Sequence, residues 1–318
     1  DEAICSWAGE RADTVYQDKR LGTGHAVLQA RERLENETDE VLVLYGDMPL
    51  LRQETLEDLI EARAKAGAAM AMITVIRDNP RGFGRVLRDE AGAVQRVVEE
   101  PEATPEQLKI RELNAGIYVY RSEFLWPNLP RLEPSPEKGE IYLTDMVELA
   151  VNEGHKVADL VLRDPTETMG VNTRVDFAAA ISALQHRINE HWMLEGVTLV
   201  DPASTYIGPN VTLGRDTTVY PNTHLRGETT VGEHCEIGPN TVVEDSSIGN
   251  RCRVVASVLE EAVMEDKSDI GPFSHLRRGA YVCSGAHIGN FGEIKNSTLG
   301  AGAKMGHVSY LGDAQIGE

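Results

Sequence analysis

The chain has 318 residues, which is enough for two or three domains with buried cores. Hydrophobic residues make up 41% and charged residues 26%, a globular composition that excludes a disordered or fibrous chain. The formal net charge of −20 argues against nucleic acid and anionic membranes as partners, whereas a few local cations can still hold small phosphorylated molecules.

Cysteine usage and hydropathy bear on the compartment. The four cysteines, Cys5, Cys235, Cys252 and Cys283, form no CxxC motif and no zinc-type spacing with histidine pairs. We therefore expect reduced thiols and a cytoplasmic protein. The most apolar stretch, residues 66–76, is too short for a membrane helix, so no membrane insertion is predicted.

Residues 1–172 alternate strand-like and helix-like patterns, which predicts an α/β domain. Strands are predicted at 40–45, 68–76, 86–87, 94–98 and 113–120. Helices are predicted at 53–66, ending at Gly67, and at 143–152. The stretch 173–194 has neither Gly nor Pro and predicts one continuous helix, so residues 173–195 are assigned as a linker.

After Gly196 the hydrophobic period changes to six. The aliphatic positions are Ile207, Leu213, Val219, Leu225, Val231, Ile237 and Val243, and after a slip at Ile248 the pattern resumes at Ile270. Because six residues form one face of a triangular prism, this period predicts a parallel β-helix over residues 196–318 with the aliphatic side chains inward. We expect the glycine that often follows the aliphatic residue to permit a tight corner.

Two turns in the first domain carry residues suited to ligand binding. Gly22-Thr23-Gly24 precedes a helical stretch and can present backbone N–H groups to a ligand, although an ordinary strand-to-helix turn is the simpler explanation. Asp47 follows the strand at 40–45, at the edge where α/β sheets bind ligands. One carboxylate with phosphates is a common magnesium arrangement, and a helix N-cap or turn is the alternative.

Further polar positions follow along the domain. Residues 81–85 contain two glycines that let backbone approach a sugar or base, or that simply turn the chain. Glu99 ends a predicted strand and can accept sugar hydroxyls or remain solvated. Asn114 and Asn172 can each bind, turn or cap, and Asn172 is well placed to be the N-cap of the helix at 173–194.

The second domain contains a compact set of polar residues near its end. Arg277 and Lys295 each follow an inward aliphatic position, and His307 and Tyr310 lie close behind them in sequence. In an acidic protein such cations suggest an anionic ligand, and an outward histidine suits general-base chemistry. Each of these residues alone is also an ordinary occupant of a solenoid surface.

Together these motifs resemble one enzyme family. The chain carries the following motifs in the same order as that family: LGTGHA, YGDMPL, GFGR, VVEE, LNAG, YLTD and GVNTR, then GPFSHLRRGA, HIGNFGEIK and GHVSYLGDAQIG. The family is that of bifunctional N-acetylglucosamine-1-phosphate uridyltransferase / glucosamine-1-phosphate N-acetyltransferase (GlmU). The resemblance implies an α/β nucleotidyltransferase domain with a Rossmann-like mixed sheet, followed by a left-handed parallel β-helix of hexapeptide repeats in a homotrimer.

The resemblance also implies a two-step activity. Acetyl passes from acetyl-CoA to glucosamine-1-phosphate, and the product is then coupled to UTP with release of pyrophosphate. The result is UDP-N-acetylglucosamine, a precursor of peptidoglycan and lipopolysaccharide. The implied partners are therefore sugar phosphates and a nucleotide, with Mg²⁺ as cofactor.

By position, the resemblance assigns roles to individual residues. The uridine nucleotide would be bound by Gln17, Gly22, Thr23, Tyr45, Gly46 and Asp47. The magnesium ligands would be Asp47 and Asn172, and the N-acetylglucosamine contacts would be Gly84, Glu99 and Asn114. In the β-helix the sugar phosphate would be held by Arg277, Lys295 and Tyr310. His307 would take a proton from the substrate amine as it attacks the thioester.

The chain also departs from the family pattern. A Gly-rich triphosphate loop that opens the family is not in this sequence, and neither are the last coils, which bind acetyl-CoA. We therefore expect both ends to be cut and residues 1–318 alone to be impaired in both reactions. Smaller departures are Asp18-Lys19-Arg20, Ala115 and Arg278.

Two other functions stay open at this point. A nucleotidyltransferase acting on another sugar-1-phosphate would share the first domain, but it has no reason to carry GHVSYLGD with Arg277 and Lys295. A non-catalytic trimeric scaffold is the alternative of another class, because a β-helix exposes flat faces suited to threefold assembly.

Overall fold

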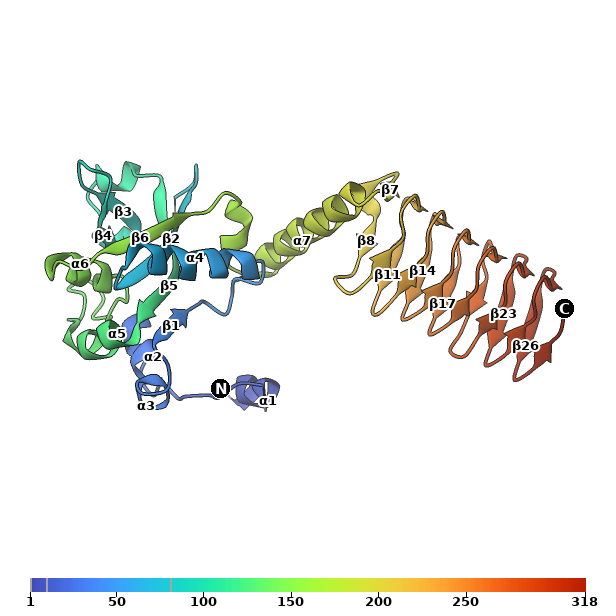
Figure 1. Ribbon diagram of the computed structural model, residues 1–318, viewed down its shortest axis with the longest axis horizontal. Helices are drawn as coiled ribbons and strands as arrows, with labels where there is room; N and C mark the ends of the chain where they lie inside the picture. The colour runs from blue at the N-terminus through green and yellow to red at the C-terminus, as the bar shows by residue number, and fades with distance from the viewer. Residues whose placement is uncertain (1, 10, 81) are drawn as a thin grey trace. The chain divides into compact units, whose positions relative to one another are not determined.

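The computed structural model describes residues 2–9, 11–80 and 82–318, so Arg81 of the third candidate turn lies outside the described residues. The chain forms two compact units, Asp1–Ala180 and Ile181–Glu318. Their border falls within helix α7 (Arg174–Leu194), which confirms the continuous helix predicted from sequence (Figure 1). The domain limits at 172 and 195 stay predictions.

A six-stranded mixed sheet forms the centre of the first unit. Its strands are β1 (Glu40–Val43), β2 (Met70–Ile76), β3 (Arg85–Arg88), β4 (Val94–Val98), β5 (Glu112–Arg121) and β6 (Val157–Val161). Strand β5 pairs antiparallel with β1, β2 and β3, whereas β2 and β6 are parallel. The predicted β3–β4 hairpin is confirmed.

The helices of this unit are α1 (Glu2–Ala8), α2 (Thr23–Leu28), α3 (Arg31–Leu34), α4 (Gln53–Ala66), α5 (Ser122–Asn128) and α6 (Asp145–Asn152). Helix α4 packs on one face of the sheet, whereas α5 and α6 pack on the other. Short 3-10 turns are η1 (Glu100–Glu102), η2 (Gln107–Lys109), η3 (Leu129–Arg131), η4 (Pro165–Thr168) and, in the second unit, η5 (Pro202–Ser204). Helix α4 ends at Gly67 in the left-handed conformation, as predicted.

Alternation along the central strands divides the core into two layers. Met72 and Tyr118 pack with α5 and α6 in one cluster, whereas Ile73 and Ile117 pack with α4 in the other. The prediction that residues 40–45 form a buried strand is wrong in part. Only Val41 of β1 is buried, and Tyr45 is 38% exposed, because within the described residues β1 is paired along one edge alone.

The second unit is a parallel β-helix with three seven-stranded faces. One face contains β7 (Thr198–Leu199), β10 (Thr218–Val219), β13 (Glu236–Ile237), β16 (Arg253–Val254), β19 (Asp269–Ile270), β22 (His287–Ile288) and β25 (Lys304–Met305). A second contains β8 (Tyr206–Ile207), β11 (His224–Arg226), β14 (Val242–Glu244), β17 (Val258–Glu260), β20 (His275–Leu276), β23 (Gly292–Lys295) and β26 (Ser309–Gly312). The third contains β9 (Thr212–Leu213), β12 (Thr230–Val231), β15 (Ser247–Ile248), β18 (Val263–Met264), β21 (Tyr281–Val282), β24 (Thr298–Leu299) and β27 (Gln315–Ile316).

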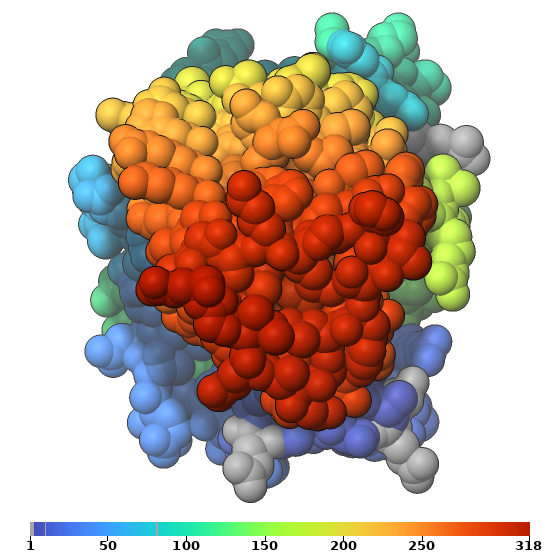
Figure 2. All heavy atoms as spheres, turned by 90° about the vertical axis from the view of Figure 1, so that its right-hand side faces the viewer, coloured from blue at the N-terminus to red at the C-terminus, as the bar shows by residue number. Residues whose placement is uncertain are grey.

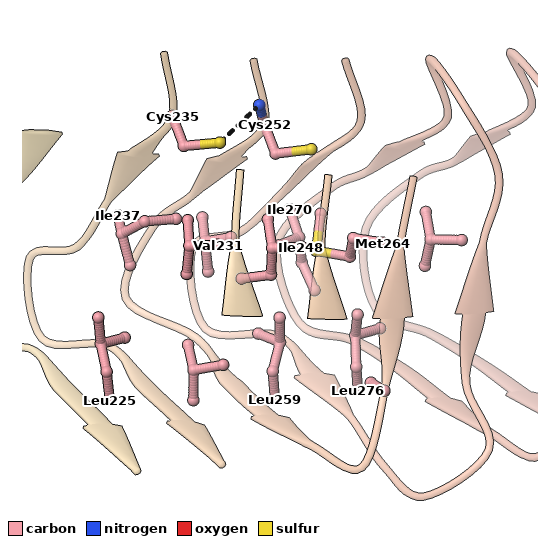
Figure 3. Packing of buried hydrophobic residues seen from close by; sticks show 14 of the residues in the cluster. Leu225, Val231, Cys235, Ile237, Ile248, Cys252, Leu259, Met264, Ile270 and Leu276 are labelled. Atoms are coloured by element: carbon pink, nitrogen blue, oxygen red, sulfur yellow. Dashed lines mark hydrogen bonds between the residues drawn. The ribbon is translucent and has the colours of Figure 1, made fainter. Parts of the chain in front are cut away.

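The predicted aliphatic side chains point inward and stack in rows. Figure 3 shows Leu225, Leu259 and Leu276 in one such row, and all three are fully buried. The register slip has a physical cause: Val243 lies 18 residues after its partner Leu225, but Leu259 follows Val243 after 16. A shorter coil breaks the six-residue spacing in sequence while it keeps the stacking in space.

The prediction that following glycines make the corners is wrong for most of them. Corner positions with positive φ are filled instead by other residues, such as Asn240 at 53° and Lys267 at 60°. A glycine such as Gly232 has an ordinary φ, but a Cβ there would lie 2.7 Å from the carbonyl carbon of Gly249 in the next coil. These glycines are therefore needed for close stacking of coils.

Two cysteines belong to the β-helix interior. Cys235 and Cys252 are buried in adjacent coils, and the Cys252 N–H points to the Cys235 sulfur at 3.4 Å (Figure 3). The C-terminal coils, red in Figure 2, form the end of the β-helix that faces the viewer. None of the described helices combines the length and apolar character needed to cross a membrane.

Candidate functional site

A cavity of about 580 Å³ opens beside the ends of β1 and β5 in the first unit. The structure brings together six of the predicted site residues as its lining: Tyr45, Asp47, Gly84, Glu99, Asn114 and Asn172. Lining residues that the sequence reasoning did not single out include Arg77, Gly116, Thr168 and Gly170. The cavity therefore gathers residues from across the whole unit.

Asp47 and Asn172 both lie next to Gly170. The Val171 N–H donates to the Asp47 carbonyl oxygen at 2.9 Å, which joins the two segments. A Cβ at Gly170 would be 3.3 Å from Asp47 Oδ2 and 3.6 Å from Asn172 Nδ2, so both side chains border this glycine. A carboxylate and an amide are oxygen donors of the kind that Mg²⁺ accepts together with phosphates and water.

The sequence expectation that Asn172 caps α7 is wrong. Thr173 is the N-cap, because its hydroxyl accepts from the Asp176 N–H at 3.2 Å while Asp176 Oδ2 accepts from the Thr173 N–H at 2.8 Å. These bonds form a capping box. The Thr173 hydroxyl also donates to Asp176 Oδ2 at 2.8 Å, and this bond, followed by that from the Thr173 N–H, lowers the pKa of Asp176. The Asn172 side chain is therefore not committed to the helix end and remains at the cavity.

Across residues 2–9, 11–80 and 82–318, no group of three or more His, Cys, Asp or Glu side chains is arranged to hold a metal ion. A pair such as Asp47 and Asn172 fits a magnesium ion that takes its remaining ligands from substrate.

Glu99 lines the same cavity and follows directly after strand β4. Its Oε1 accepts from the Thr144 hydroxyl at 3.0 Å. Burial raises the pKa of Glu99, and the Thr144 hydrogen bond opposes that rise. Nearby, burial and the carboxylates of Glu102, Glu148 and Glu99 raise the pKa of Asp145 to about 6. This side of the cavity therefore has an excess of negative charge.

The Tyr45 ring packs against Gly116. Gly116 has φ +74°, and a Cβ at this position would overlap the Tyr45 ring, so glycine is required both by the backbone and by the packing. Burial, followed by the charges of Glu99 and Asp47, raises the pKa of the Tyr45 phenol. Tyr45 is therefore neutral at physiological pH and presents its ring and hydroxyl to the cavity.

The Asn114 amide already has partners. Its Nδ2 donates to the buried Tyr118 hydroxyl at 2.7 Å, and its Oδ1 accepts from the Gly116 N–H at 3.1 Å. These bonds fix the Asn114 side chain and the bend at Gly116. Contact between Asn114 and a sugar stays a prediction.

Gln17, Gly22 and Thr23 do not line the cavity. A Cβ at Gly22 would lie 2.7 Å from the Ile141 backbone nitrogen, and the Leu143 N–H donates to Thr23 Oγ1 at 3.0 Å. Gln17 Nε2 contacts His25 Nδ1 at 2.9 Å. This turn thus packs against the segment that leads to Thr144, the hydrogen-bond partner of Glu99.

A second candidate site lies on the β-helix. A cavity of about 470 Å³ is lined by Glu244, Asp245, Glu260, Glu261, Arg277, Arg278 and Lys295. Arg277 and Lys295 are neighbours in adjacent coils, since the Arg277 N–H donates to the Ile294 carbonyl. Arg277 Nη1 also donates to Glu293 Oε1 at 3.0 Å, a partner that the sequence reasoning missed.

Tyr310 and His307 lie at the end of this face. The Tyr310 phenol lies over Gly312, which pairs in register with Lys295. Tyr310 is therefore close to the Lys295 position on this face. His307 is exposed in the turn between β25 and β26, as an outward position predicts. It is outside the cavity lining, so its approach to Arg277 and Lys295 stays a prediction.

Comparison with known proteins gives two family matches. The family described as nucleotidyl transferase matches residues 8–193, and the bacterial transferase hexapeptide family, with six repeats, matches residues 210–245. The first match covers most of the α/β unit and continues along α7, and the second lies within the β-helix.

Curated relatives match nearly the whole chain. The bifunctional protein GlmU of Exiguobacterium sibiricum is 42% identical over 99% of this chain and 70% of its own length. Those of Halalkalibacterium halodurans and Enterococcus faecalis are each 41% identical over 100% of this chain and 70% and 69% of their own lengths. The similarity therefore includes both units.

Proposed function

The chain belongs to the GlmU family of bifunctional proteins, and we propose that it carries both activities of UDP-N-acetylglucosamine synthesis. The first unit is a nucleotidyltransferase that joins N-acetylglucosamine-1-phosphate to UTP. The second is an acetyltransferase that acetylates glucosamine-1-phosphate. The single observation that carries the first assignment is the cavity where Asp47, Asn172 and Glu99 converge.

In the first unit the sugar phosphate oxygen attacks the α-phosphorus of UTP, and the bond to pyrophosphate breaks. Asp47 and Asn172 would hold Mg²⁺, which neutralises phosphate charge during phosphoryl transfer. Glu99 and Gly84 border the same wall, where a Cβ at Gly84 would lie 3.6 Å from Glu99 Oε1, which suits a close approach of sugar hydroxyls. Tyr45 supplies an apolar face for the substrate.

In the second unit the glucosamine nitrogen attacks the acetyl-CoA carbonyl, and the thiol of coenzyme A leaves. Arg277 and Lys295 supply adjacent positive charges for the sugar phosphate, with Tyr310 beside them. His307 accepts the proton that the nitrogen releases, a role supported by its exposed position at the end of the same face.

Assembly and location belong to the same proposal. A parallel β-helix with flat faces fits a homotrimer, and substrates of this kind fit a cytoplasmic protein. The alternative of a pyrophosphorylase for another sugar is not favoured, because the relatives over both units are GlmU proteins. The same finding disfavours a non-catalytic scaffold.

The test of the first activity measures binding and turnover together. Titration calorimetry with UDP-N-acetylglucosamine and Mg²⁺ should detect binding that EDTA weakens. A coupled assay should detect pyrophosphate from UTP and N-acetylglucosamine-1-phosphate in preference to glucose-1-phosphate. Equal use of the two sugars would contradict the substrate assignment.

The second activity is tested with His307→Ala. Release of the coenzyme A thiol in the presence of glucosamine-1-phosphate should fall sharply in this variant while pyrophosphate release is unchanged. His186→Ala, on helix α7, is the matched control. Thiol release that survives in His307→Ala would remove this histidine from the reaction.

A further inference from the structure

Arg77 stands out among the residues that line the first cavity. It is the only Lys or Arg among the described lining residues, beside the acids Asp47, Glu99 and Asp176. The residue follows the end of β2, and its backbone N–H donates to the Arg111 carbonyl at 3.1 Å. No role described above uses its side chain.

One end of the guanidinium bonds to the segment that leads to Asn172. Arg77 Nη2 donates to the Pro165 carbonyl at 2.7 Å and to the Thr168 hydroxyl at 2.5 Å. Both acceptors belong to η4, directly before Gly170 and Asn172. Thr168 is fully buried, so this turn is held firmly in place.

The face of the same guanidinium contacts the other wall. The Arg77 Cζ atom lies 4.9 Å from the centre of the Phe83 ring, a cation–π contact. Phe83 lies between Gly82 and Gly84, in a turn whose backbone is held from the β4 side by Glu100, which accepts from the Gly82 N–H at 2.6 Å, and by Arg85, which donates to the Phe83 carbonyl. Arg77 therefore touches both walls of the cavity at once.

We propose that Arg77 is a positioning residue that sets the separation of residues 82–84 and 165–172, and so sets the width of the sugar phosphate site. The inference rests on the proposed function of the first unit. A planar guanidinium can donate in its plane to two oxygens while its face stacks on a ring, which an ammonium group cannot do. The geometry thus requires arginine, and positive charge alone is insufficient.

The substitution Arg77→Lys tests shape against charge. We expect it to weaken binding of UDP-N-acetylglucosamine about tenfold in calorimetry, the size of one lost cation–π contact plus one hydrogen bond. Arg77→Met should weaken binding of UDP-N-acetylglucosamine by a similar factor. If Arg77→Lys binds as wild type while Arg77→Met does not, charge alone matters and the positioning role is wrong.

Two further measurements separate positioning from general damage. The melting temperature of Arg77→Lys should stay close to that of wild type. Amide hydrogen exchange should become faster at residues 82–84 and 168–172 and should be unchanged in the β4 strand. The matched control is Arg121→Lys, at the end of β5, where Arg121 pairs with Glu123 and does not line this cavity.

Coupling to the ring is tested with Phe83→Leu. Because both side chains form one contact, the double variant should lose less binding than the product of the two single losses. If wild type itself fails to bind UDP-N-acetylglucosamine, the proposed function fails. In that case the exchange experiment still decides the role of Arg77, and unchanged exchange at both segments would overturn it.

Discussion

Val171 donates its backbone N–H to the Asp47 carbonyl oxygen at 2.9 Å, and this bond joins the turn after β1 to the segment before α7. It brings the Asp47 carboxylate and the Asn172 amide together next to Gly170 although they are far apart in sequence. The capping box at Thr173 and Asp176 holds the second segment from its other end. The candidate magnesium site is therefore fixed by hydrogen bonds that need no metal.

The first prediction concerns the Asp47 charge. Asp47→Asn keeps the shape but removes the negative charge that would attract Mg²⁺. Pyrophosphate release should fall about 100-fold, equivalent to about 2.7 kcal/mol of transition-state stabilisation. The unfolding curve should not change, because the bond to Val171 uses the backbone oxygen. Asp58→Asn, exposed on α4, is the control, and a comparable loss there would contradict the prediction.

The second prediction concerns pH and Asp145. Burial first, and then neighbouring carboxylates, raises its pKa to about 6, above an ordinary value of about 3.9. The native state therefore holds more protons than the unfolded state between about pH 4 and pH 6, and the free energy of unfolding falls as pH rises through this window. Asp145→Asn should remove that loss.

After discounting for solvent screening, we expect Asp145→Asn to raise the free energy of unfolding by about 1 kcal/mol at pH 7. At pH 4 the variant and wild type should unfold alike. Urea unfolding of the first unit at both pH values measures the difference. An equal gain at the two pH values would show that the charge of Asp145 is not responsible.

The third prediction concerns coil stacking. Gly232→Ala places a Cβ against the Gly249 backbone of the next coil and should destabilise the β-helix by about 1–3 kcal/mol. Thr212→Ala, exposed on β9, should change stability by less than about 0.5 kcal/mol. Chemical denaturation measures both variants. A neutral Gly232→Ala would mean that the coils can separate at this point without cost.

The fourth prediction concerns Arg277 and the binding of the sugar phosphate on the β-helix. Arg277→Ala removes a cation from the candidate phosphate site and leaves Glu293 without its partner, so the KM for glucosamine-1-phosphate should rise about tenfold. Arg226 occupies the equivalent position in an earlier coil, outside the cavity. Arg226→Ala should therefore leave the KM unchanged, and an equal rise in both variants would point to a general charge effect.

Spacing alone predicted the inward positions of the β-helix because every coil imposes the same steric demand. Between Ile248 and Ile270 the sequence analysis passed over Val254, which keeps the six-residue spacing, and the six-residue rule missed Leu259 and Met264, which each follow the previous inward position after five residues because the coils there are shorter. Corner residues were also mispredicted. Asn240 and Lys267 adopt the left-handed conformation that the sequence analysis reserved for glycine, because hydrogen bonds to the preceding coil hold them there.

The cavity of the first unit was predictable where a motif carries its own chemistry, as at Asp47 and Glu99. Arg77 gave no such signal, because its role depends on Pro165, Thr168 and Phe83, which approach it only in the fold. Asn172 was predicted as the N-cap of α7, but the helix begins one residue later than expected and Thr173 is the N-cap. Gln17, Gly22 and Thr23 pack beside the cavity, and their contacts with nucleotide stay predictions.

The variable coil length has a consequence for how the β-helix accommodates insertions and deletions. Glu244, Glu260, Arg277 and Lys295 occupy one column, although the gaps between them in sequence differ. Residues lost at a corner shorten the path around the prism without moving any side chain out of its column. A residue added within a strand would instead exchange inward and outward side chains along that face. Alignments of such domains should therefore be anchored on columns, with gaps assigned to corners.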